Sequence, residues 1–289
     1  MSDGSALLEV RDLRKVFTRR GSDRQRSELV ALDDVSFTLA RERSLAIVGE
    51  SGSGKTTVAR LIIGLERATR GTITVLGEDR SRPAVRTAER RRRGRQVQIV
   101  FQDPYSSLDP SQCIGECVDE VLRLHFELSR SDRRRRTNEL LEQVGLGERD
   151  GRALPRSLSG GQRQRAAIAR ALAAEPTILI LDEAVAALDV SIQAQVLNRL
   201  ADVRDETGMT YIFISHDLSV VRQLTQEAIV MQQGRIVEQG PTARVLDAPE
   251  HEYTKLLRES VPVPGWKPKR AWLEPESGPS NHADHGAGQ

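Results

Sequence analysis

A strand, a glycine-rich loop and a helix follow one another near the start of the chain. Residues Ser44–Val48 have the apolar pattern of a short strand, and helical spacing of apolar residues begins at Thr56. Between them lies Gly49-Glu50-Ser51-Gly52-Ser53-Gly54-Lys55-Thr56, which fits the pattern G-x-x-x-x-G-K-[ST]. Its glycines let backbone N–H groups turn inward around phosphates. Because a chance glycine-rich turn would lack the flanking strand and helix, the segment predicts a cradle for a nucleoside triphosphate.

A second glycine loop, Leu158-Ser159-Gly160-Gly161-Gln162, precedes an apolar helical run. The N-terminus of that helix would present its backbone N–H groups to an anion. One triphosphate needs only one such cradle. Two loops therefore indicate that each chain holds its own nucleotide and caps the nucleotide of a neighbouring chain.

Strand and helix patterns alternate along much of the chain, which argues for a mostly parallel sheet with helices on its faces. A polar stretch at 19–28 predicts a loop, and the turn Gln233-Gly234 predicts a hairpin within 227–239. We expect an inserted helical subdomain at about 103–157, with helices at 114–128 and 131–144. The other predicted strands are 7–17, 30–39, 71–76, 96–101, 177–182 and 210–215, and the other predicted helices are 56–65, 161–173, 190–206 and 218–224.

Charge and hydropathy exclude several classes of function. The 289 residues carry a net charge of +2 from 43 basic and 41 acidic residues, so no global field attracts nucleic acid. Arginine runs at 90–93 and 133–136 lack interleaved aromatics and favour solvated helix faces. No apolar run approaches the roughly 20 residues that span a bilayer, and we expect no signal peptide before the first strand. Past Val261 the chain is rich in proline and poor in apolar residues, which predicts a disordered tail.

The two cysteines, Cys113 and Cys117, stand four residues apart in a predicted helix. A metal or redox pair would need further Cys or suitably spaced His residues, which the sequence does not supply. The spacing therefore favours two semi-buried thiols in a reducing compartment.

Two carboxylates follow the most apolar strand pattern. Four aliphatic residues, 178–181, suit a strand buried on both faces, and Asp182 and Glu183 come directly after them. The C-terminal edge of a parallel sheet is where such folds bind ligands. There Asp182 and the Thr56 hydroxyl would hold magnesium, while Lys55 would contact the β- and γ-phosphates. Glu183 would polarise the water that attacks the γ-phosphate.

Two further polar residues end apolar strands in the same way. His216 follows the strand pattern 211–215, and a position at the same sheet edge favours a contact with the γ-phosphate over a structural role. Gln102 follows 97–101, where the helical insert begins. We expect Gln102 to touch the metal while moving with the insert.

These motifs, together with Ala187-Leu188-Asp189, occur in the order found in ABC transporter ATPases, which this chain resembles from residue 7 to about 262. Three segments resemble the oligopeptide, dipeptide and nickel importer subfamily: Val100-Phe101-Gln102-Asp103-Pro104-Tyr105-Ser106-Ser107-Leu108-Asp109-Pro110, the stretch 188–197, and His251-Glu252-Tyr253-Thr254-Lys255-Leu256-Leu257. Three sites depart from the family pattern: Ala184 where Pro is usual, Ala186 where Ser is usual, and Leu154-Pro155-Arg156-Ser157 where Tyr-Pro-His-Glu is more usual. The lost hydroxyl at Ala186 would weaken one cross-dimer hydrogen bond, worth about 1 kcal/mol.

The resemblance implies an α/β fold: a P-loop NTPase core, with a mostly parallel sheet and helices on both faces, plus an antiparallel β subdomain and an inserted α-helical subdomain. It implies an ATPase domain at 7–250 and a shortened C-terminal extension at 251–289. The implied cofactors are ATP and Mg²⁺. No iron–sulfur cluster is expected, because the extension lacks the cysteine cluster that some subfamily members use.

The resemblance also assigns roles to particular residues. Phe17 would stack on adenine, Asp189 would lie at the dimer interface, and the second glycine loop would contact the γ-phosphate held by the opposite subunit. The implied ATP-binding residues are Phe17, Gly49, Glu50, Ser51, Gly52, Ser53, Gly54, Lys55, Thr56, Thr57, Ser159, Gly160, Gly161, Gln162 and Asp189. The implied metal ligands are Thr56, Gln102 and Asp182, and the implied catalytic residues are Glu183, His216 and Gln102.

The function implied is ATP hydrolysis that energises peptide uptake from the cytoplasmic face of the cell membrane. The expected partners are a second ATPase chain (a heterodimer), two transmembrane permease subunits and, indirectly, an extracytoplasmic substrate-binding protein, with no nucleic acid. The same scaffold could import nickel or another small solute. Two different classes of function are a soluble ABC protein acting on ribosomes or DNA, and a regulatory domain that binds ATP without turnover. The single set of motifs and the lack of heptads argue against a ribosome or DNA protein. The intact Glu183 and His216 argue against a domain without turnover.

Overall fold

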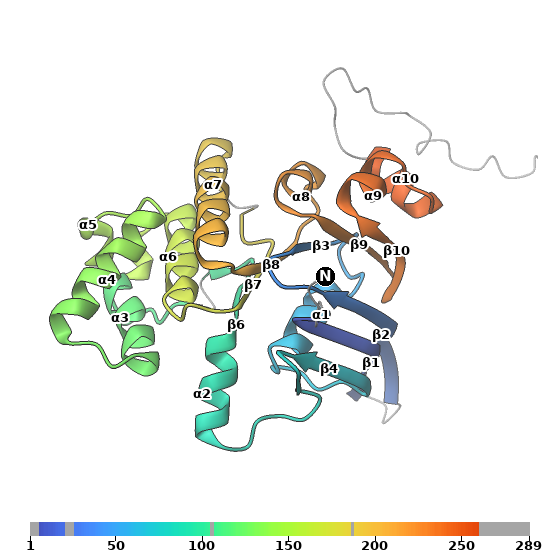
Figure 1. The fold of residues 1–289 in the computed structure, drawn as a ribbon, viewed down its shortest axis with the longest axis horizontal. Coiled ribbons are helices and arrows are strands. Elements are labelled where there is room, and N and C mark those ends of the chain that lie inside the picture. Colours follow the sequence, from blue (N-terminus) through green and yellow to red (C-terminus); the bar gives the residue numbers. More distant parts are fainter. Residues whose placement is uncertain (1–5, 21–25, 105–106, 186–187, 260–289) are drawn as a thin grey trace, which may run out of the picture.

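The structure, a computed structural model, describes residues 6–20, 26–104, 107–185 and 188–259 (Figure 1). Two expectations fall outside these residues: the disordered tail after Val261, and the effect of Ala186 on a cross-dimer hydrogen bond.

A six-stranded sheet runs through the centre of the molecule in the order β10-β9-β3-β8-β7-β6. Its first five strands along the chain are parallel, and only β10 is antiparallel to its neighbour. Every residue of β3, β7 and β8 is buried, which is why these strands read as continuous apolar runs. The strands are β3 (Ser44–Val48), β6 (Val97–Val100), β7 (Ile178–Asp182), β8 (Thr210–Ile214), β9 (Glu227–Gln232) and β10 (Arg235–Pro241), so the predicted parallel core and the 227–239 hairpin are confirmed.

A second, antiparallel sheet has the order β2-β1-β4-β5. Its strands are β1 (Leu8–Arg20), β2 (Arg26–Leu39), β4 (Arg70–Val75) and β5 (Glu78–Asp79). Helix α1 (Lys55–Ile62) lies between the two sheets, and its apolar residues form one core with β1, β2, β4 and one face of the central sheet (Figure 1). The antiparallel β unit implied by the resemblance is therefore present.

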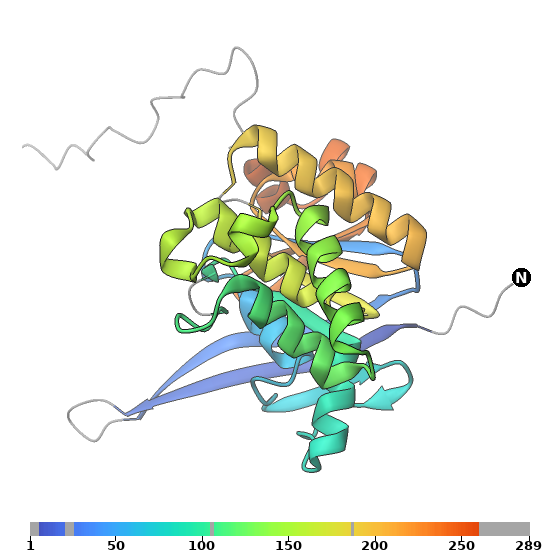
Figure 2. The ribbon, with the colours of Figure 1, turned by 90° about the vertical axis from the view of Figure 1, so that its left-hand side faces the viewer.

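The predicted loop at 19–28 is wrong over much of its length. Strands β1 and β2 continue as a hairpin, with Thr18 opposite Glu28 and Arg20 opposite Arg26. Figure 2 shows this hairpin projecting beyond the rest of the chain. Leu29 and Val30 of this hairpin are exposed, so the ladder does not depend on apolar burial there, and hydropathy cannot distinguish it from a loop.

Helices cover the other face of the central sheet in two groups. The larger group packs with β6, β7 and β8 and contains α3 (Ile114–His125), α4 (Arg130–Gln143), α6 (Gly160–Leu172) and α7 (Val190–Thr207). Helix α5 (Glu148–Gly151) has no buried residue and contacts α3 and α4. Figure 1 shows α3, α4 and α5 gathered to one side of the sheet. The smaller group packs on β3 and β9 and contains α8 (Leu218–Leu224), α9 (Thr242–Asp247) and α10 (Glu252–Glu259). Of these helices, sequence patterns predicted all but α5, α9 and α10.

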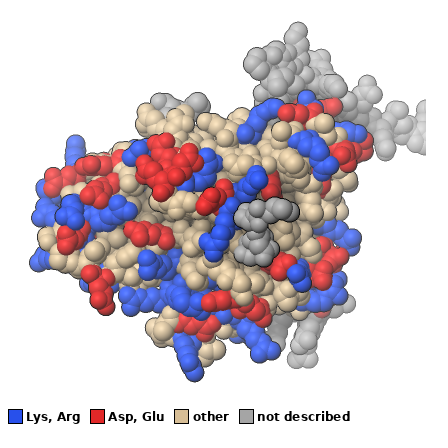
Figure 3. Space-filling model, in the orientation of Figure 1, with Lys and Arg blue, Asp and Glu red and all other residues tan. Residues whose placement is uncertain are grey.

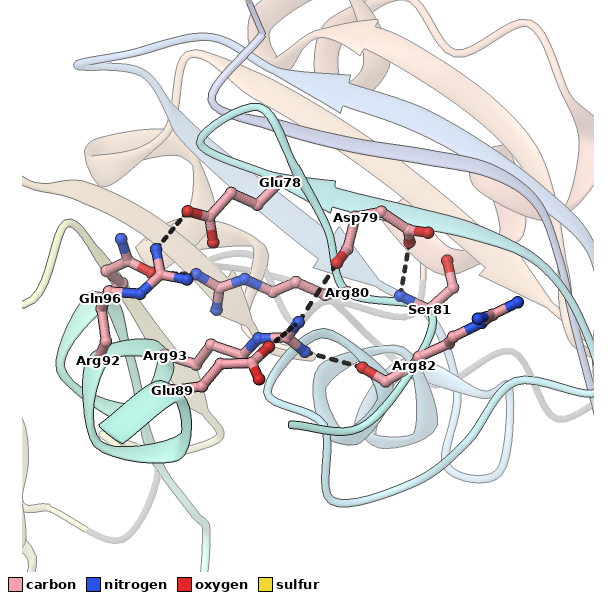
Figure 4. Close-up of polar contacts among 9 residues, drawn as sticks. All are labelled: Glu78, Asp79, Arg80, Ser81, Arg82, Glu89, Arg92, Arg93 and Gln96. Carbon is pink, nitrogen blue, oxygen red and sulfur yellow. Dashed lines mark hydrogen bonds and ion pairs between the residues drawn. The ribbon is translucent and has the colours of Figure 1, made fainter. Parts of the chain in front are cut away.

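The first arginine run lies in α2 (Thr87–Gln96), where it joins the helix to β5 (Figure 4). Arg80 is only 8% exposed and donates a hydrogen bond to Gln96. Burial and repulsion by Arg93 lower the pKa of Arg80 to about 10. Arg93 in turn pairs with Glu89 at 2.6 Å and donates to the Arg82 carbonyl at 2.8 Å. The run is thus partly a structural network that leads into β6, not only a solvated face.

The second arginine run lies in α4 and is paired with carboxylates. Arg133 pairs with Asp119 at 2.9 Å and Arg135 with Asp132 at 2.8 Å. Figure 3 shows basic and acidic side chains interspersed over the face that it presents. Both runs therefore have local partners of opposite charge.

Cys113 and Cys117 are both free thiols. Cys113 is half-buried at the residue before α3, as predicted, whereas Cys117 is more buried than predicted and lies within that helix. Among the described helices, we find none with the length and apolar character needed to cross a membrane.

Candidate active site

The carboxyl ends of four parallel strands bring the predicted nucleotide residues to one edge of the central sheet. Strands β3, β8, β7 and β6 are neighbours in that order. Gly49 follows β3 and His216 lies just past β8. Asp182 ends β7, and Gln102 lies just past β6. Residues from four distant segments thus meet at the edge where such sheets bind ligands.

The first glycine loop has a backbone that only glycine fits at two positions. Gly49 has φ +149°, and a Cβ atom there would lie 2.2 Å from the Met231 carbonyl oxygen. Gly54 has φ +105°, and its Cβ would lie 2.7 Å from Leu32 Cδ2. The loop is therefore pressed against β2 and β9, so its glycines are required by packing as well as by conformation.

The Lys55 ammonium lies inside this loop. The side chain is 6% exposed, and Nζ donates to the Gly49 carbonyl at 2.8 Å and to the Glu50 carbonyl at 2.7 Å. Burial lowers the pKa of Lys55, against the opposing fields of Glu183 and Asp182. The buried Ser53 hydroxyl has no hydrogen-bond partner among the described residues. A buried cation and an unpartnered hydroxyl in one glycine loop fit a phosphate group.

Asp182 and Thr56 form the oxygen-rich part of the site. Asp182 is 4% exposed, and the nearby Thr56 side chain favours the ionised form of its carboxylate. Burial raises the pKa of Asp182, while Thr56 and Lys55 oppose the rise. A carboxylate beside a hydroxyl is a pair of hard oxygen donors, which is what Mg²⁺ prefers. The residues present therefore fit the predicted metal.

Glu183 adopts a left-handed backbone conformation, with φ +50°. Its N–H donates to the Ile214 carbonyl at 2.9 Å, which ties the end of β7 to the end of β8. Its carboxylate lies 3.5 Å from His216 Nδ1. A non-glycine residue in this region costs about 1–3 kcal/mol, and such residues cluster at functional sites. Glu183 and His216 are thus brought together at the sheet edge.

Gln102 has an exposed side chain, and the residue before it is tied to helix α6. Gln164 is fully buried in α6, and its Nε2 donates to the Phe101 carbonyl at 3.1 Å. The Arg60 guanidinium of α1 lies 6.0 Å from the centre of the Phe101 ring. Sequence reasoning missed Gln164 because nothing local indicates a contact with β6.

The second glycine loop begins α6 with a capping box. The Ser159 hydroxyl accepts from the Gln162 N–H at 3.2 Å, and Gln162 Oε1 accepts from the Ser159 N–H at 2.9 Å. The spacing S-x-x-Q before an apolar run is the sequence signal for such a box. Asp189 caps α7 in the same manner, accepting from the Ile192 N–H at 2.9 Å. Contact of these residues with the nucleotide of a second chain stays a prediction.

Phe17 lies on β1 and is half-buried. The Lys15 ammonium sits 4.5 Å from the centre of its ring, and Lys15 is held there by Glu66 at 2.8 Å. Stacking of Phe17 on adenine stays a prediction.

The fold and this sheet-edge site define a nucleotide hydrolase of the P-loop type. The sequence profile for ABC transporter matches residues 32–186, and that for the C-terminal region of oligopeptide/dipeptide transporters matches residues 237–287. The dipeptide transport ATP-binding protein DppF of Haemophilus influenzae is 42% identical over 263 residues, covering 91% of this chain and 80% of that protein. DppF of Escherichia coli is 42% identical over 257 residues, covering 89% and 76%.

A solved structure agrees with the sequence relatives. The dimeric ATP-binding cassette MJ0796, in a post-hydrolysis state bound to ADP and Pi, superimposes with a TM-score of 0.74 at 28% identity, covering 81% of this chain and 98% of that one. The chain belongs to the ABC transporter family, as a subunit that binds and hydrolyses ATP.

Proposed function

We propose that this chain is one of two ATPase subunits that energise peptide import. The names of its relatives support a peptide substrate, since DppF of both organisms is a dipeptide transport subunit. The match at residues 237–287 supports the same subfamily. The observation that carries the proposal is the meeting of the glycine loop, Asp182, Glu183 and His216 at one sheet edge.

Hydrolysis would use residues that the fold already holds in reach of one another. Lys55 would exchange its two loop carbonyls for phosphate oxygens, and the Ser53 hydroxyl would gain a partner. Glu183 would accept a proton from the attacking water, because it follows the last residue of β7 at the sheet edge where the loop lies. His216, 3.5 Å from Glu183, would orient that carboxylate and contact the γ-phosphate.

Thr56, Asp182 and Gln102 would hold Mg²⁺. The bound ion would neutralise charge on the β- and γ-phosphates. The Thr56 side chain lies near enough to the Asp182 carboxylate to lower its pKa, which supports a shared site for these two oxygen donors. Gln102 lies where the helical segment begins. It would therefore couple the nucleotide site to movement of that segment.

The second glycine loop would close on a nucleotide held by another chain. A Cβ atom at Gly160 would meet nothing within 4 Å, so its own chain gives no steric reason for glycine there. A close approach by a group outside the chain supplies that reason. We propose a heterodimer with a second ATPase, in contact with two permease subunits at the cytoplasmic face of the membrane and served indirectly by an extracytoplasmic binding protein. The proposed division is an ATPase domain at 7–250, a helical subdomain at about 103–157 and an extension at 251–289.

The test is purification of the tagged full chain from its own cells in detergent, followed by reconstitution in lipid vesicles. We expect two integral membrane chains and a second ATPase in the complex, and ATP turnover that rises when peptide and its binding protein are supplied. Stimulation by nickel instead would select the alternative substrate. A chain that sediments without membrane proteins and with ribosomes would refute the transport role.

Glu183→Gln tests the catalytic role proposed for Glu183. It removes the proton acceptor while keeping size and hydrogen bonding, so we expect turnover to fall by about 10²–10⁴-fold. ATP binding should stay intact, and the closed two-chain state should accumulate. Normal turnover would remove Glu183 from its proposed role.

A further inference from the structure

Tyr253 lies in α10, near the end of the described chain, yet its side chain reaches the core beneath the glycine loop. The residue is 6% exposed and packs with Ala46 and Val48 of β3 and with Val230 of β9. Because β3 leads directly into Gly49, the tyrosine ring supports the strand from which the loop emerges.

The Tyr253 hydroxyl contacts the loop itself. It accepts a hydrogen bond from the Glu50 N–H at 3.0 Å, across 203 residues of sequence. The carbonyl of Glu50 accepts a hydrogen bond from Lys55 Nζ. Both backbone groups of Glu50 are therefore engaged, one by the loop lysine and the other by α10.

A separate set of hydrogen bonds fixes where α10 begins. The buried Glu238 carboxylate of β10 accepts from the Glu250 N–H at 3.0 Å and from the His251 N–H at 3.2 Å. His251 Nδ1 then accepts from the Tyr253 N–H at 3.1 Å, so the imidazole caps the first turn of the helix. The chain from Glu238 to Tyr253 thus carries the hydroxyl to one defined place.

We propose that Tyr253 is a positioning residue for nucleotide binding: its hydroxyl holds the Glu50 peptide so that the glycine loop keeps its phosphate-binding form. This inference rests on the proposed role of residues 49–56 as the nucleotide loop. It gives the C-terminal segment a function at the ATP site, through the loop backbone and without contact with the nucleotide.

Loss of this bond should appear in affinity and not in the chemical step. A loop that spends part of its time in other conformations binds nucleotide with an affinity reduced by the competent fraction. One unmade hydrogen bond to the loop should therefore raise the Kd for ADP by about three- to tenfold. At saturating ATP the loop is fully occupied, so KM should rise with kcat retained.

The experiment measures ADP binding to the full chain by titration calorimetry, together with thermal unfolding, for Tyr253→Phe and a matched control. Tyr211→Phe is that control, because its hydroxyl is also buried and donates to a backbone carbonyl, that of Leu200, at 2.8 Å. Tyr211→Phe should lower the melting temperature and leave ADP affinity unchanged. Tyr253→Phe should do the reverse, losing affinity about three- to tenfold with a smaller change in melting temperature.

Wild-type ADP affinity in Tyr253→Phe overturns the proposal, and so does an equal loss of affinity in both variants, because that would reflect general loosening. Lys55→Ala serves as a third arm. If Lys55→Ala binds ADP normally, the assignment of the nucleotide loop fails. If Lys55→Ala loses binding while Tyr253→Phe keeps it, only the role of Tyr253 fails.

Discussion

The two glycine loops differ in whether contacts within the same chain require glycine. In the first loop, added Cβ atoms at Gly49 and Gly54 would collide with Met231 and Leu32 of the same chain. In the second loop, an added Cβ at Gly160 meets open space, and one at Gly161 meets only Leu188 Cδ2, at 3.3 Å. The first loop is thus specified by its own fold, and the second has a glycine that its own fold does not require.

The surroundings of the two loops show the same difference. The first is held from outside by Tyr253 and by the Gly234 N–H, which donates to the Ser53 carbonyl at 3.0 Å. The second is held by its own capping box and by Gln162, which bonds Asp150 at 3.0 Å. On the proposed function, we expect the first loop to bind nucleotide within the single chain and the second loop to need another chain to complete its site.

The largest effect is expected from Gly49→Ala. The new methyl would lie 2.2 Å from the Met231 carbonyl at a φ of +149°, so clash and strain together should cost about 4 kcal/mol. We expect ADP affinity to fall about a thousandfold, measured by calorimetry. Gly64→Ala is the control, since it also has positive φ (+80°) but meets nothing within 4 Å. Equal effects of the two changes would show that strain alone matters and would break the contrast between the loops.

Gly160→Ala should have a smaller effect, and on a different quantity. Alanine is the better helix former at the first residue of α6, so stability should hold or rise slightly, and ADP binding to the single chain should not change. Turnover by the two-chain assembly should fall about tenfold or more, because the methyl displaces the loop from the opposite nucleotide.

Mixed assemblies locate the loss caused by Gly160→Ala. With one altered chain, hydrolysis should fail at the nucleotide held by the Lys55 loop of the unaltered chain. Full turnover in these assemblies, or a loss confined to the altered chain's own Lys55 site, would contradict the sandwich between two chains.

The smallest expected effect is at Asp189. Asp189→Ala removes the cap of α7 and should lower the free energy of unfolding by about 1 kcal/mol, measured by denaturant titration. Asp189→Asn keeps a capping oxygen and should restore stability. If the carboxylate also acts between chains, the Asn variant will remain impaired in turnover. Restored turnover in the Asn variant would show that Asp189 acts only as the cap of α7 and has no role between chains.

Local signals in the sequence were enough to predict the parallel core and the first glycine loop. Strands β3, β7 and β8 are buried on both faces, so each reads as an unbroken apolar run. The polar residues at their ends then follow from the shared direction of parallel strands. The strand ends at Gln102 and His216 were predictable for the same reason.

Other features depend on partners that no local pattern reveals. Helix α2 has no buried residue, and its position comes from ion pairs and from Arg80 bonded to Gln96. The distal part of the β1–β2 hairpin is specified by its ladder and not by apolar alternation. The bonds from Gln164 to Phe101 and from Glu50 to Tyr253 join residues 63 and 203 positions apart.

The tyrosine under the glycine loop also bears on how the protein is made. A ribosome translates Glu50 long before Tyr253, which follows 203 residues later. Until that residue leaves the exit tunnel, a nascent chain carries the loop without the hydroxyl that anchors it. Products of premature termination before residue 253 would therefore bind nucleotide more weakly than finished subunits.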